Sequence, residues 1–294
     1  MQKLKIFLTG GTSFIGRNFI EQLGERFDII APGHAELDLT DSVAVYNFLE
    51  KNPVDVVVHA ANVGGNRKQQ PVTGSTQINL KMFFNLVRAK SFFKRLIILG
   101  SGAEYDKQRP LVKVKETDFD KHVPNDEYVL YKYVCASYAG KVDYITHLRL
   151  FAVFGKYEDY ETRFISNAIC RALLKTPITI RQNVMFDYLF IDDFIRILER
   201  CIVEKPKEIF INIGRGEAID LKTLAEKVLY EIGYEAPIQI ANNGWAKEYS
   251  CDVTILKELF PDLSYTPVDN AIVNLVAYYK TVLPNLNHQA LLEE

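Results

Sequence analysis

The chain has 294 residues, and its 35 Lys and Arg against 37 Asp and Glu leave a formal net charge of −2. So small a net charge gives no general attraction for phosphate backbones or anionic membranes, which excludes a non-specific nucleic-acid binder. A hydrophobic content of 48% with 24% charged residues is typical of a folded globular protein and excludes a disordered chain. The length allows two domains, or one domain with a large second lobe.

Targeting and cysteine signals are both weak. No apolar run reaches the roughly 20 residues that a membrane-spanning helix requires, and the apolar stretch at the start is too short for a signal peptide. The four cysteines lie far apart without a CxxC pair, so neither a disulfide framework nor a cysteine-based zinc site is indicated. We therefore expect a cytoplasmic protein with reduced thiols, no membrane or nucleic-acid partner and no bound metal.

The first 150 residues alternate short β-branched or aromatic runs with longer amphipathic stretches, as the β-α units of a parallel sheet do. Several strand candidates are nearly continuous apolar runs, which indicates burial on both faces. The pattern predicts an α/β fold with a doubly wound parallel (Rossmann) sheet. The expected strands are residues 5–9, 27–31, 54–59, 95–100 and 144–150. The expected helices between them are residues 14–23, 42–50, 78–89 and 127–138.

After about residue 156 the pattern becomes less regular. No repeat or flexible linker separates the two parts, so we expect them to pack together with the site between them. The expected organisation is a dinucleotide-binding domain over residues 1–155, with return segments near 186–214, and a smaller substrate-binding lobe over residues 156–294. The expected elements of this part are a helix at 163–174, a strand at 178–181, a strand and helix within 189–203, a strand at 211–214 and a helix at 221–232.

A glycine-rich segment, TGGTSFIG at residues 9–16, follows the first expected strand and opens the first helix, where a dinucleotide-binding turn lies. Backbone N–H groups at a helix N-terminus face a pyrophosphate, and the helix dipole favours its negative charge. Gly10 would make the tight turn, and Gly16 would allow the helix to pack closely on the strand. An ordinary glycine-rich β-α turn is the alternative. The residues expected to contact the cofactor here are Gly10, Thr12, Ser13, Phe14, Ile15 and Gly16.

Two further segments, LDLTD at residues 37–41 and HAA at residues 59–61, favour a dinucleotide. Asp38, followed by Leu39, would meet the adenine amino group, and a turn or helix-entry role for Asp38 is the alternative. Ala60 and Ala61, which end the third strand, are small enough to let a cofactor lie against the backbone. We therefore expect Asp38, Leu39, Ala60 and Ala61 to bind the cofactor.

The choice between NAD and NADP depends on the end of the second strand. An acidic residue there would select the free ribose of NAD, whereas an arginine would select the phosphate of NADP. This chain has IIAPGHAE at residues 29–36, with no acid at the strand end and only His34 as a weak cation. We expect NAD or NADP, with NADP slightly favoured because nothing repels its phosphate.

Tyr128 and Lys132 in EYVLYKYV are four residues apart in an expected helix and therefore project from the same face. An ammonium near a phenol favours the phenolate, so Lys132 would help Tyr128 to act as a general acid and base at a carbonyl. Lys132 would also reach the nicotinamide ribose, and Ser101 would donate a hydrogen bond to the same carbonyl oxygen. An isolated Tyr/Lys pair is usually surface decoration, but the order of glycine turn, HAA, serine and Tyr-x-x-x-Lys favours redox chemistry.

With these residues in place, the chain resembles the extended short-chain dehydrogenase/reductase family, also called the NAD-dependent epimerase/dehydratase family. The likeness covers most of the chain, since RLFAVFGK at residues 149–156, FDYLFIDDF at 186–194 and INIG at 211–214 also match recurrent family segments. The resemblance implies a bound NAD or NADP, a nucleotide-diphosphate sugar in the cleft and a homodimer. It also implies a catalytic triad of Ser101, Tyr128 and Lys132, and adds Asn79 in INLKMFFNL to the cofactor-binding residues.

Within the family, residues 33–65 most resemble the GDP-fucose synthase-like nucleotide-sugar reductases, which implies that Val63, Gly64 and Gly65 lie near the sugar. Those synthases epimerise with a cysteine two residues after the catalytic serine and a histidine in the following lobe. This chain has Ala103 and Arg163 at these positions. Because an alanine cannot protonate a carbanion, we do not expect epimerisation by that route.

Other departures from the family pattern affect the remaining activities. Sugar 4,6-dehydratases carry Thr-Asp-Glu where residues 101–103 of this chain are Ser-Gly-Ala, so dehydration is not expected. Ser13 replaces the middle glycine of TGxxGxxG, which an ordinary backbone torsion would tolerate.

Ala152 stands where an asparagine usually contacts substrate, and Phe186 where an arginine usually binds the diphosphate. Arg171 and Arg181 are our candidates for that charge, alongside Arg163 near the sugar. The alternative for each of Arg171 and Arg181 is a solvated surface arginine.

These observations leave three hypotheses. The leading one is an NAD(P)-dependent oxidoreductase that acts on a nucleotide-diphosphate sugar as a 4-ketoreductase. The first alternative is a C4 epimerase that retains NAD and returns the same hydride. The second is a non-catalytic protein that senses a dinucleotide, against which the retained serine, tyrosine and lysine argue.

Overall fold

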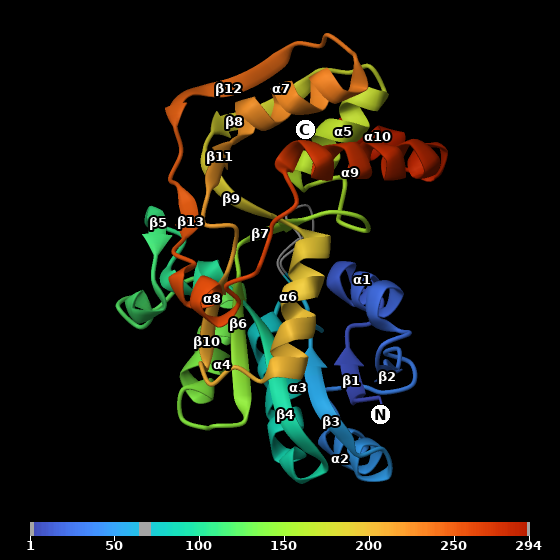
Figure 1. Ribbon diagram of the computed structural model, residues 1–294, viewed down its shortest axis with the longest axis vertical. Helices are drawn as coiled ribbons and strands as arrows, with labels where there is room; N and C mark the ends of the chain where they lie inside the picture. The colour runs from blue at the N-terminus through green and yellow to red at the C-terminus, as the bar shows by residue number, and fades with distance from the viewer. Residues whose placement is uncertain (1–2, 65–71, 293–294) are drawn as a thin grey trace.

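The protein is described by a computed structural model that covers residues 3–64 and 72–292. Its two lobes are stacked along the long axis of the molecule (Figure 1). The lower lobe carries the N-terminus and a central sheet, and the upper lobe carries the C-terminus and several helices. None of the described helices combines the length and the apolar character needed to cross a membrane.

The strands and helices expected in the first half are confirmed, with small changes at their ends. The structure adds one short strand, β5, that had not been expected. In chain order the elements are β1 (Lys5–Thr9), α1 (Phe14–Leu23), β2 (Asp28–Ile30), α2 (Ser42–Lys51), β3 (Val54–His59), α3 (Ser75–Arg88), β4 (Phe93–Ser101), β5 (Leu111–Val114), α4 (Glu127–Ala139) and β6 (Ile145–Leu150).

The central sheet is parallel throughout and has the strand order β10-β6-β4-β3-β1-β2. Successive side chains of β1 enter different cores, since Ile6 and Leu8 belong to one buried cluster and Phe7 to the other. Helices α2, α3 and α4 cover the second cluster, and α1 packs against α6 (Ile191–Glu204) on the opposite face. This is the predicted doubly wound fold.

The second half contains the expected elements and several unexpected ones. The short strands β7, β11 and β13, the longer strand β12 and the C-terminal helices were not predicted. In chain order the elements are β7 (Ala152–Phe154), α5 (Phe164–Leu173), β8 (Ile178–Asn183), β9 (Met185–Phe190), α6, β10 (Phe210–Ile213), β11 (Ala218–Asp220), α7 (Leu221–Ile232), β12 (Ile238–Trp245), β13 (Tyr249–Cys251), α8 (Thr254–Leu259), α9 (Val268–Val282) and α10 (His288–Leu292).

A second sheet grows from the carboxyl ends of the central strands. Its order is β11-β9-β13-β5, with β7 paired to β9. Because β5 follows β4 and β7 follows β6 along the chain, this sheet begins where the central strands end. Parallel strands present their carboxyl ends at one edge, so the second sheet closes over the edge where α/β proteins bind ligands.

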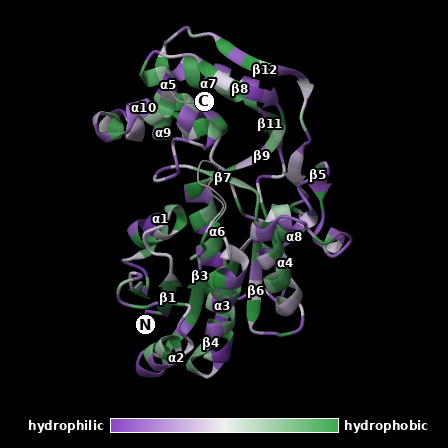
Figure 2. Cartoon of the chain, turned by 180° about the vertical axis from the view of Figure 1, so that it is seen from behind, coloured by the Kyte–Doolittle hydropathy of each residue, from purple (hydrophilic) through white to green (hydrophobic). Residues whose placement is uncertain are grey.

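Hydropathy follows this layering. From behind, β3 is mostly hydrophobic, whereas helices such as α3 carry both hydrophobic and hydrophilic residues (Figure 2). All four cysteines are buried free thiols.

A buried carboxylate, Asp193 on α6, accepts hydrogen bonds from the backbone N–H (2.9 Å) and hydroxyl (2.7 Å) of Thr266 and pairs with Arg196. It thereby ties α6 to the segment that leads into α9.

We expect Asp193→Ala to lower the free energy of unfolding by about 2–4 kcal/mol, because the Thr266 groups and Arg196 lose their shared acceptor. Asp192→Ala is the control, since Asp192 is partly exposed and burial raises its pKa, which makes its charge unfavourable in the fold. We expect that control to change the free energy by no more than about 1 kcal/mol. Urea denaturation measures both, and equal losses would contradict the assignment.

Candidate active site

A cavity of about 1140 Å³ lies at the carboxyl edge of the central sheet, between the two lobes. Its lining comes from the ends of β3, β4 and β6, from the start of α4 and from the second sheet. The lining residues that matter most below are Phe14, Ile15, Ala60, Ala61, Ser101, Tyr128, Lys132, Glu158, Arg163, Phe186 and Tyr249.

The glycine turn is shaped by close backbone contacts. Gly10 has a φ of +72°, and a Cβ on it would lie 2.8 Å from the backbone nitrogen of Ala61. A Cβ on Gly16 would lie 2.1 Å from the carbonyl oxygen of Gly10, so both glycines are required. Ser13 has an ordinary φ of −73°, and its hydroxyl accepts the N–H of Gly16 as the N-cap of α1. The serine that replaces the middle glycine is therefore tolerated.

These features fit a dinucleotide. Phe14 and Ile15, in the first turn of α1, line the cavity together with the small residues Ala60 and Ala61. The first turn of α1 contains no acidic residue, so the N–H groups and the helix dipole face an anion without repulsion. Thr12 is exposed at the tip of the turn.

The end of β3 is fixed by a short hydrogen-bond chain. The hydroxyl of Thr9 accepts the N–H of Ala61 (3.2 Å) and shares a hydrogen bond with Nδ1 of His59 (2.8 Å). Burial, followed by the charge of Lys132, lowers the pKa of His59 to about 3. His59 is therefore neutral, and it holds the Ala60-Ala61 segment in place without adding charge.

The residues expected at the adenosine lie apart from the lining of the cavity. The carboxylate of Asp38 accepts the N–H and the hydroxyl of Thr40, each at 2.8 Å, and these bonds lower its pKa. These bonds give Asp38 the turn role that was named above as the alternative to cofactor binding. The carbonyl of Leu39 accepts the side-chain amide of Asn85 (2.9 Å), and His34 is exposed. Cofactor contacts of Asp38, Leu39 and His34 stay predictions.

Asn79 is 1% exposed, and both polar atoms of its side chain bind the backbone of Val63 at 2.8 Å. It therefore positions the segment after β3. The next residue, Gly64, has a φ of +89° and lines the cavity, where a Cβ would lie 3.5 Å from the Tyr128 ring. Gly65, also expected near the sugar, lies outside the described residues.

The structure brings Ser101, Tyr128 and Lys132 to the same cavity. Ser101 ends β4, and Asp126 caps α4 just before Tyr128. Lys132 donates to the carbonyl of Leu99 (2.9 Å), and its Nζ lies 5.6 Å from the centre of the Tyr128 ring. Burial opposes the ammonium of Lys132, but the nearby phenol groups more than offset it and raise its pKa, so Lys132 stays charged.

The expected arginines are dispersed. Arg163 is exposed and lines the cavity. Arg171 is buried, where it donates to Asn167 (3.0 Å) and to the carbonyl of Pro177 (3.4 Å), and Arg181 is exposed on β8. Neither Arg171 nor Arg181 is among the described residues that line the cavity.

Two other cations, Lys107 and Lys247, do line the cavity and were not identified from the sequence. Lys107 pairs with Asp126 (2.9 Å), and Lys247 donates to the carbonyl of Gln108. Lysine residues in loops carry no local signal for such a role, so sequence reasoning could not have selected them.

An aromatic wall faces the triad from the second sheet. Phe186 packs against Tyr188 and Tyr249, and Tyr249 also packs against Phe151 with ring centres 4.9 Å apart. Tyr249 lines the same cavity as Ser101. The second sheet therefore shares this cavity with the triad, and Phe186 occupies the cavity wall as an apolar residue.

Glu158 brings a carboxyl group to the cavity from the second half of the chain. Burial raises its pKa to about 8, although the Ser166 hydroxyl (2.8 Å) and the charge of Arg163 act in the opposite sense. Glu158 is therefore protonated at neutral pH, a property that its sequence neighbours do not reveal.

Because the pKa of Glu158 is higher in the folded chain than its ordinary value of 4.5, ionisation of Glu158 opposes folding. This contribution to stability is present below about pH 4.5 and is lost as the pH rises through about 8. We expect Glu158→Gln to exceed wild type in stability by about 1–2 kcal/mol at pH 9 and to match it near pH 4.5. Denaturant titrations across this range test it, and parallel pH curves for the two proteins would contradict it.

Comparison with known proteins finds a matching family and relatives of similar sequence. The NAD dependent epimerase/dehydratase family matches residues 6–214 of the chain. GDP-L-fucose synthase from Azorhizobium caulinodans is 28% identical over 258 residues, covering 78% of this chain and 81% of the relative. GDP-L-fucose synthase 1 from Arabidopsis thaliana is 24% identical over 268 residues, covering 82% and 80%.

Solved structures share the fold. The GDP-L-fucose synthetase of Naegleria fowleri bound to NADP superposes with a TM-score of 0.84 at 16% identity, over 97% of this chain and 95% of that one. UDP-glucose 4-epimerase of Thermotoga maritima has a TM-score of 0.80 at 20% identity, over 95% and 100%. The family match, which spans the glycine turn, the serine and the tyrosine-lysine pair, shows that the chain belongs to the NAD dependent epimerase/dehydratase family.

Proposed function

We propose that this protein is an NAD(P)-dependent oxidoreductase that reduces the 4-keto group of a nucleotide-diphosphate sugar. One observation carries the proposal: Ser101, Tyr128 and Lys132 line a single cavity with the first turn of α1, and that cavity extends to the second sheet. The relatives named GDP-L-fucose synthase support the substrate class. The non-catalytic alternative is disfavoured because all three triad residues face the cavity.

The bound nicotinamide would supply the hydride that reaches C4 of the sugar. Tyr128 would donate its phenolic proton to the keto oxygen, so that the carbonyl gains a hydride and a proton and becomes an alcohol. Ser101 would donate a hydrogen bond to the same oxygen as charge develops on it. The Lys132 ammonium, fixed on the carbonyl of Leu99, would stabilise the phenolate that remains.

Ala103 supports reduction without epimerisation at a neighbouring carbon. It is 8% exposed and lines the cavity two residues after Ser101, and its methyl group can neither give nor take a proton. The C4 epimerase alternative needs the same triad and no further acid. It is kept because structures of 4-epimerases share the fold, and cofactor turnover separates the two.

NADP is the proposed cofactor, with NAD as the alternative. Strand β2 ends at Ile30 and is followed by Ala31 and Pro32, so the strand end itself carries no acidic residue that would select the free ribose of NAD. His34 is exposed in the loop after β2, Arg17 is exposed on α1, and the Naegleria synthetase is bound to NADP.

We propose that residues 1–155, with the return segments near 186–214, hold the dinucleotide, and that residues 156–294 mainly hold the nucleotide sugar. Lys107, Arg163 and Lys247 take the place of Arg171 and Arg181 as the cations for the sugar diphosphate, because they line the cavity.

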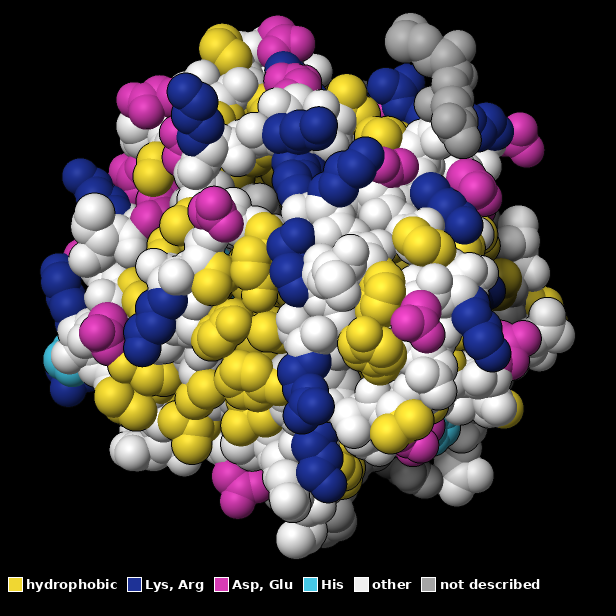
Figure 3. Space-filling model, turned by 90° about the horizontal axis from the view of Figure 1, so that it is seen from below, with side chains coloured by type: hydrophobic (Ala, Val, Ile, Leu, Met, Phe, Trp, Pro, Cys, Tyr) yellow, Lys and Arg dark blue, Asp and Glu magenta, His cyan; other side chains and the backbone are white. Residues whose placement is uncertain are grey.

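We also propose a cytoplasmic homodimer. The four buried free thiols suit a reducing compartment. Helices α3 and α4 pack side by side, with the partly exposed rings of Phe84 and Tyr138 5.4 Å apart. The end of the molecule opposite the second lobe shows a broad hydrophobic patch beside a row of Lys and Arg side chains (Figure 3). Such surfaces suit association of two copies.

Gly16→Ala should weaken NADPH binding at least about tenfold, because its Cβ would lie 2.1 Å from the carbonyl oxygen of Gly10 and push the turn out of shape. Gly140→Ala is the control: Gly140 caps α4 with a negative φ of −64°, and a Cβ there would meet the Phe210 ring at 3.3 Å and the carbonyl oxygen of Ala136 at 3.9 Å. NADPH fluorescence titration measures both. A folded Gly16→Ala protein with wild-type affinity would argue against this turn as the binding site.

Tyr128→Phe should lower the rate of NADPH oxidation with nucleotide 4-keto sugars by about 10²–10⁴-fold, because the proton donor is lost. Tyr133→Phe is the control, since Tyr133 lies on the same helix, is not among the described residues that line the cavity, and donates its hydroxyl to Asp120. Equal rates for wild type and Tyr128→Phe would refute the proposal. Sugar conversion without net NADPH loss, with NAD released on denaturation, would instead establish the epimerase.

A further inference from the structure

We propose that Glu104 is a positioning residue of the catalytic centre, whose buried carboxylate fixes Ser101 and acts as a constant negative charge that weakens the pull of Lys132 on Tyr128. The catalytic roles of these three residues come from the proposed function, on which this inference rests. Glu104 itself touches neither the sugar nor the cofactor in this account.

Glu104 lies in a 3₁₀ turn, Gly102–Tyr105, that directly follows β4, and it is fully buried. Its Oε1 accepts the backbone N–H of Ser101 (2.8 Å), while the hydroxyl of Ser101 accepts the N–H of Ala103 (3.1 Å). These two bonds form a capping box that fixes the backbone and the side chain of the catalytic serine together.

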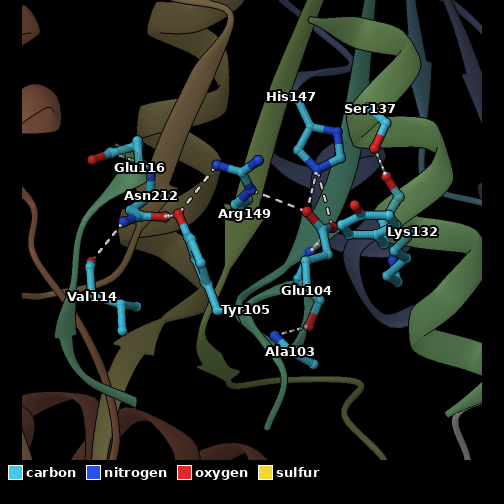
Figure 4. A network of polar contacts seen from close by, with 12 residues as sticks. Ala103, Glu104, Tyr105, Val114, Glu116, Lys132, Ser137, His147, Arg149 and Asn212 are labelled. Carbon is cyan, nitrogen blue, oxygen red and sulfur yellow. Dashed lines mark hydrogen bonds and ion pairs between the residues drawn. The ribbon is translucent and has the colours of Figure 1, made fainter. Parts of the chain in front are cut away.

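The carboxylate has two partners on β6, the neighbouring strand. Nε2 of His147 lies 3.0 and 2.9 Å from its two oxygens, and Nε of Arg149 donates to Oε2 (3.0 Å). In Figure 4 the Glu104 carboxylate lies between Arg149 and Lys132. Burial alone would raise the pKa of Glu104, but the hydrogen bonds from His147 and the Ser101 N–H, together with the charge of Arg149, outweigh burial and hold it below its usual value. Glu104 is therefore ionised.

His147 does not cancel this charge. Burial lowers the pKa of His147, despite the opposing effect of Glu104, so the ring is neutral and donates its Nε2 proton to the carboxylate. Its Nδ1 has no hydrogen-bond partner among the described residues, which also disfavours a proton there. The cluster thus holds one negative charge on Glu104 and one positive charge on Arg149.

The strand beside the cluster is shaped to admit it. A Cβ on Gly100 would lie 2.1 Å from Nε2 of His147 and 2.6 Å from Oε1 of Glu104. Gly100 is thus required by this pair of side chains. Gly100, on the strand that ends at Ser101, therefore leaves the space that the Glu104–His147 pair occupies.

The network continues away from the triad. Arg149 donates to the hydroxyl of Tyr105 (3.1 Å), which donates to Oδ1 of Asn212 (2.7 Å). The backbone N–H of Asn212 donates to Glu116 (2.8 Å). Glu116 is therefore a second carboxylate of the same network that does not contact Ser101 or Lys132, and it provides a matched control.

Removal of the charge on Glu104 should shift the ionisation of Tyr128 in one direction only. Lys132 would keep its ammonium with less negative charge around it, so the phenolate of Tyr128 would form at lower pH. The other titratable and charged groups around Lys132 and Glu104 are Tyr131 and Cys135 on α4, His59 on β3, His147 and Arg149 on β6, and Tyr249 on β13.

The direct test is ¹³C NMR of protein labelled at the tyrosine Cζ, with NADP⁺ present and Tyr128 assigned through Tyr128→Phe. We expect Glu104→Gln to move the ionisation midpoint of Tyr128 to lower pH by at least about half a unit. Glu104→Asp, which keeps the charge, and Glu116→Gln, the matched control, should leave the midpoint in place. No resolved shift in Glu104→Gln would overturn the inference.

Kinetics supply a second readout. Reduction needs protonated Tyr128, so the alkaline limb of kcat for Glu104→Gln should move to lower pH, whereas a purely structural defect would lower kcat equally at all pH values. Glu104→Asp should lose about 5- to 10-fold in kcat with an unmoved limb, because it no longer reaches the Ser101 N–H. If wild type reduces no keto sugar, the proposed function fails, while the NMR titration still decides the role of Glu104.

Wild type alone provides a check that needs no variant to fold. Nitrogen NMR of the histidine rings should show His147 as the neutral Nε2–H tautomer, without titration between about pH 6.5 and 9, because burial lowers its pKa from the ordinary value of 6.5. A His147 ring that gains a proton within that range would cancel the charge of Glu104 and overturn the inference.

Discussion

Burial of the Glu104 carboxylate constrains the whole catalytic edge of the sheet. An ionised carboxylate without solvent is tolerated only when it is paired and fully hydrogen-bonded. His147 and Arg149 meet this need because they are two residues apart on β6 and so share one face of the strand. The β4–β6 register, which sets Gly100 opposite Arg149, brings them to the end of β4. The position of Ser101 follows from this arrangement, because Glu104 accepts its backbone N–H.

The edge of the central sheet also determines where the second lobe attaches. Strands β5 and β7 leave β4 and β6 at their carboxyl ends and join β9 and β13, so the aromatic wall with Tyr249 comes to face Ser101. Residues from both halves of the chain therefore line a single cavity. A change in the second sheet is therefore expected to alter the wall of the cavity that Ser101 also lines.

Local signals explain what could be predicted from the sequence. The strands are short apolar runs, the glycine turn joins β1 to α1, and Tyr128 and Lys132 are neighbours on one helix, so each is readable within a few residues. Glu104 stands beside Ser101 in the sequence, but its role depends on β6, more than forty residues away. The cations Lys107 and Lys247 depend likewise on loop positions. Strands of three or four residues, such as β13 and β5, show too little alternation to predict, whereas the periodic apolar residues of α9 offered a signal that was missed.

The central claim is that one carbonyl group, bound in the cavity between the lobes, receives a hydride at its carbon and a proton at its oxygen. The most direct measurement uses NADPH deuterated at C4 of the nicotinamide, on either face, with a nucleotide 4-keto sugar, and locates the deuterium in the product by NMR. This account predicts deuterium at C4 of the sugar from one of the two labelled cofactors. A sugar product without deuterium from either cofactor would contradict it.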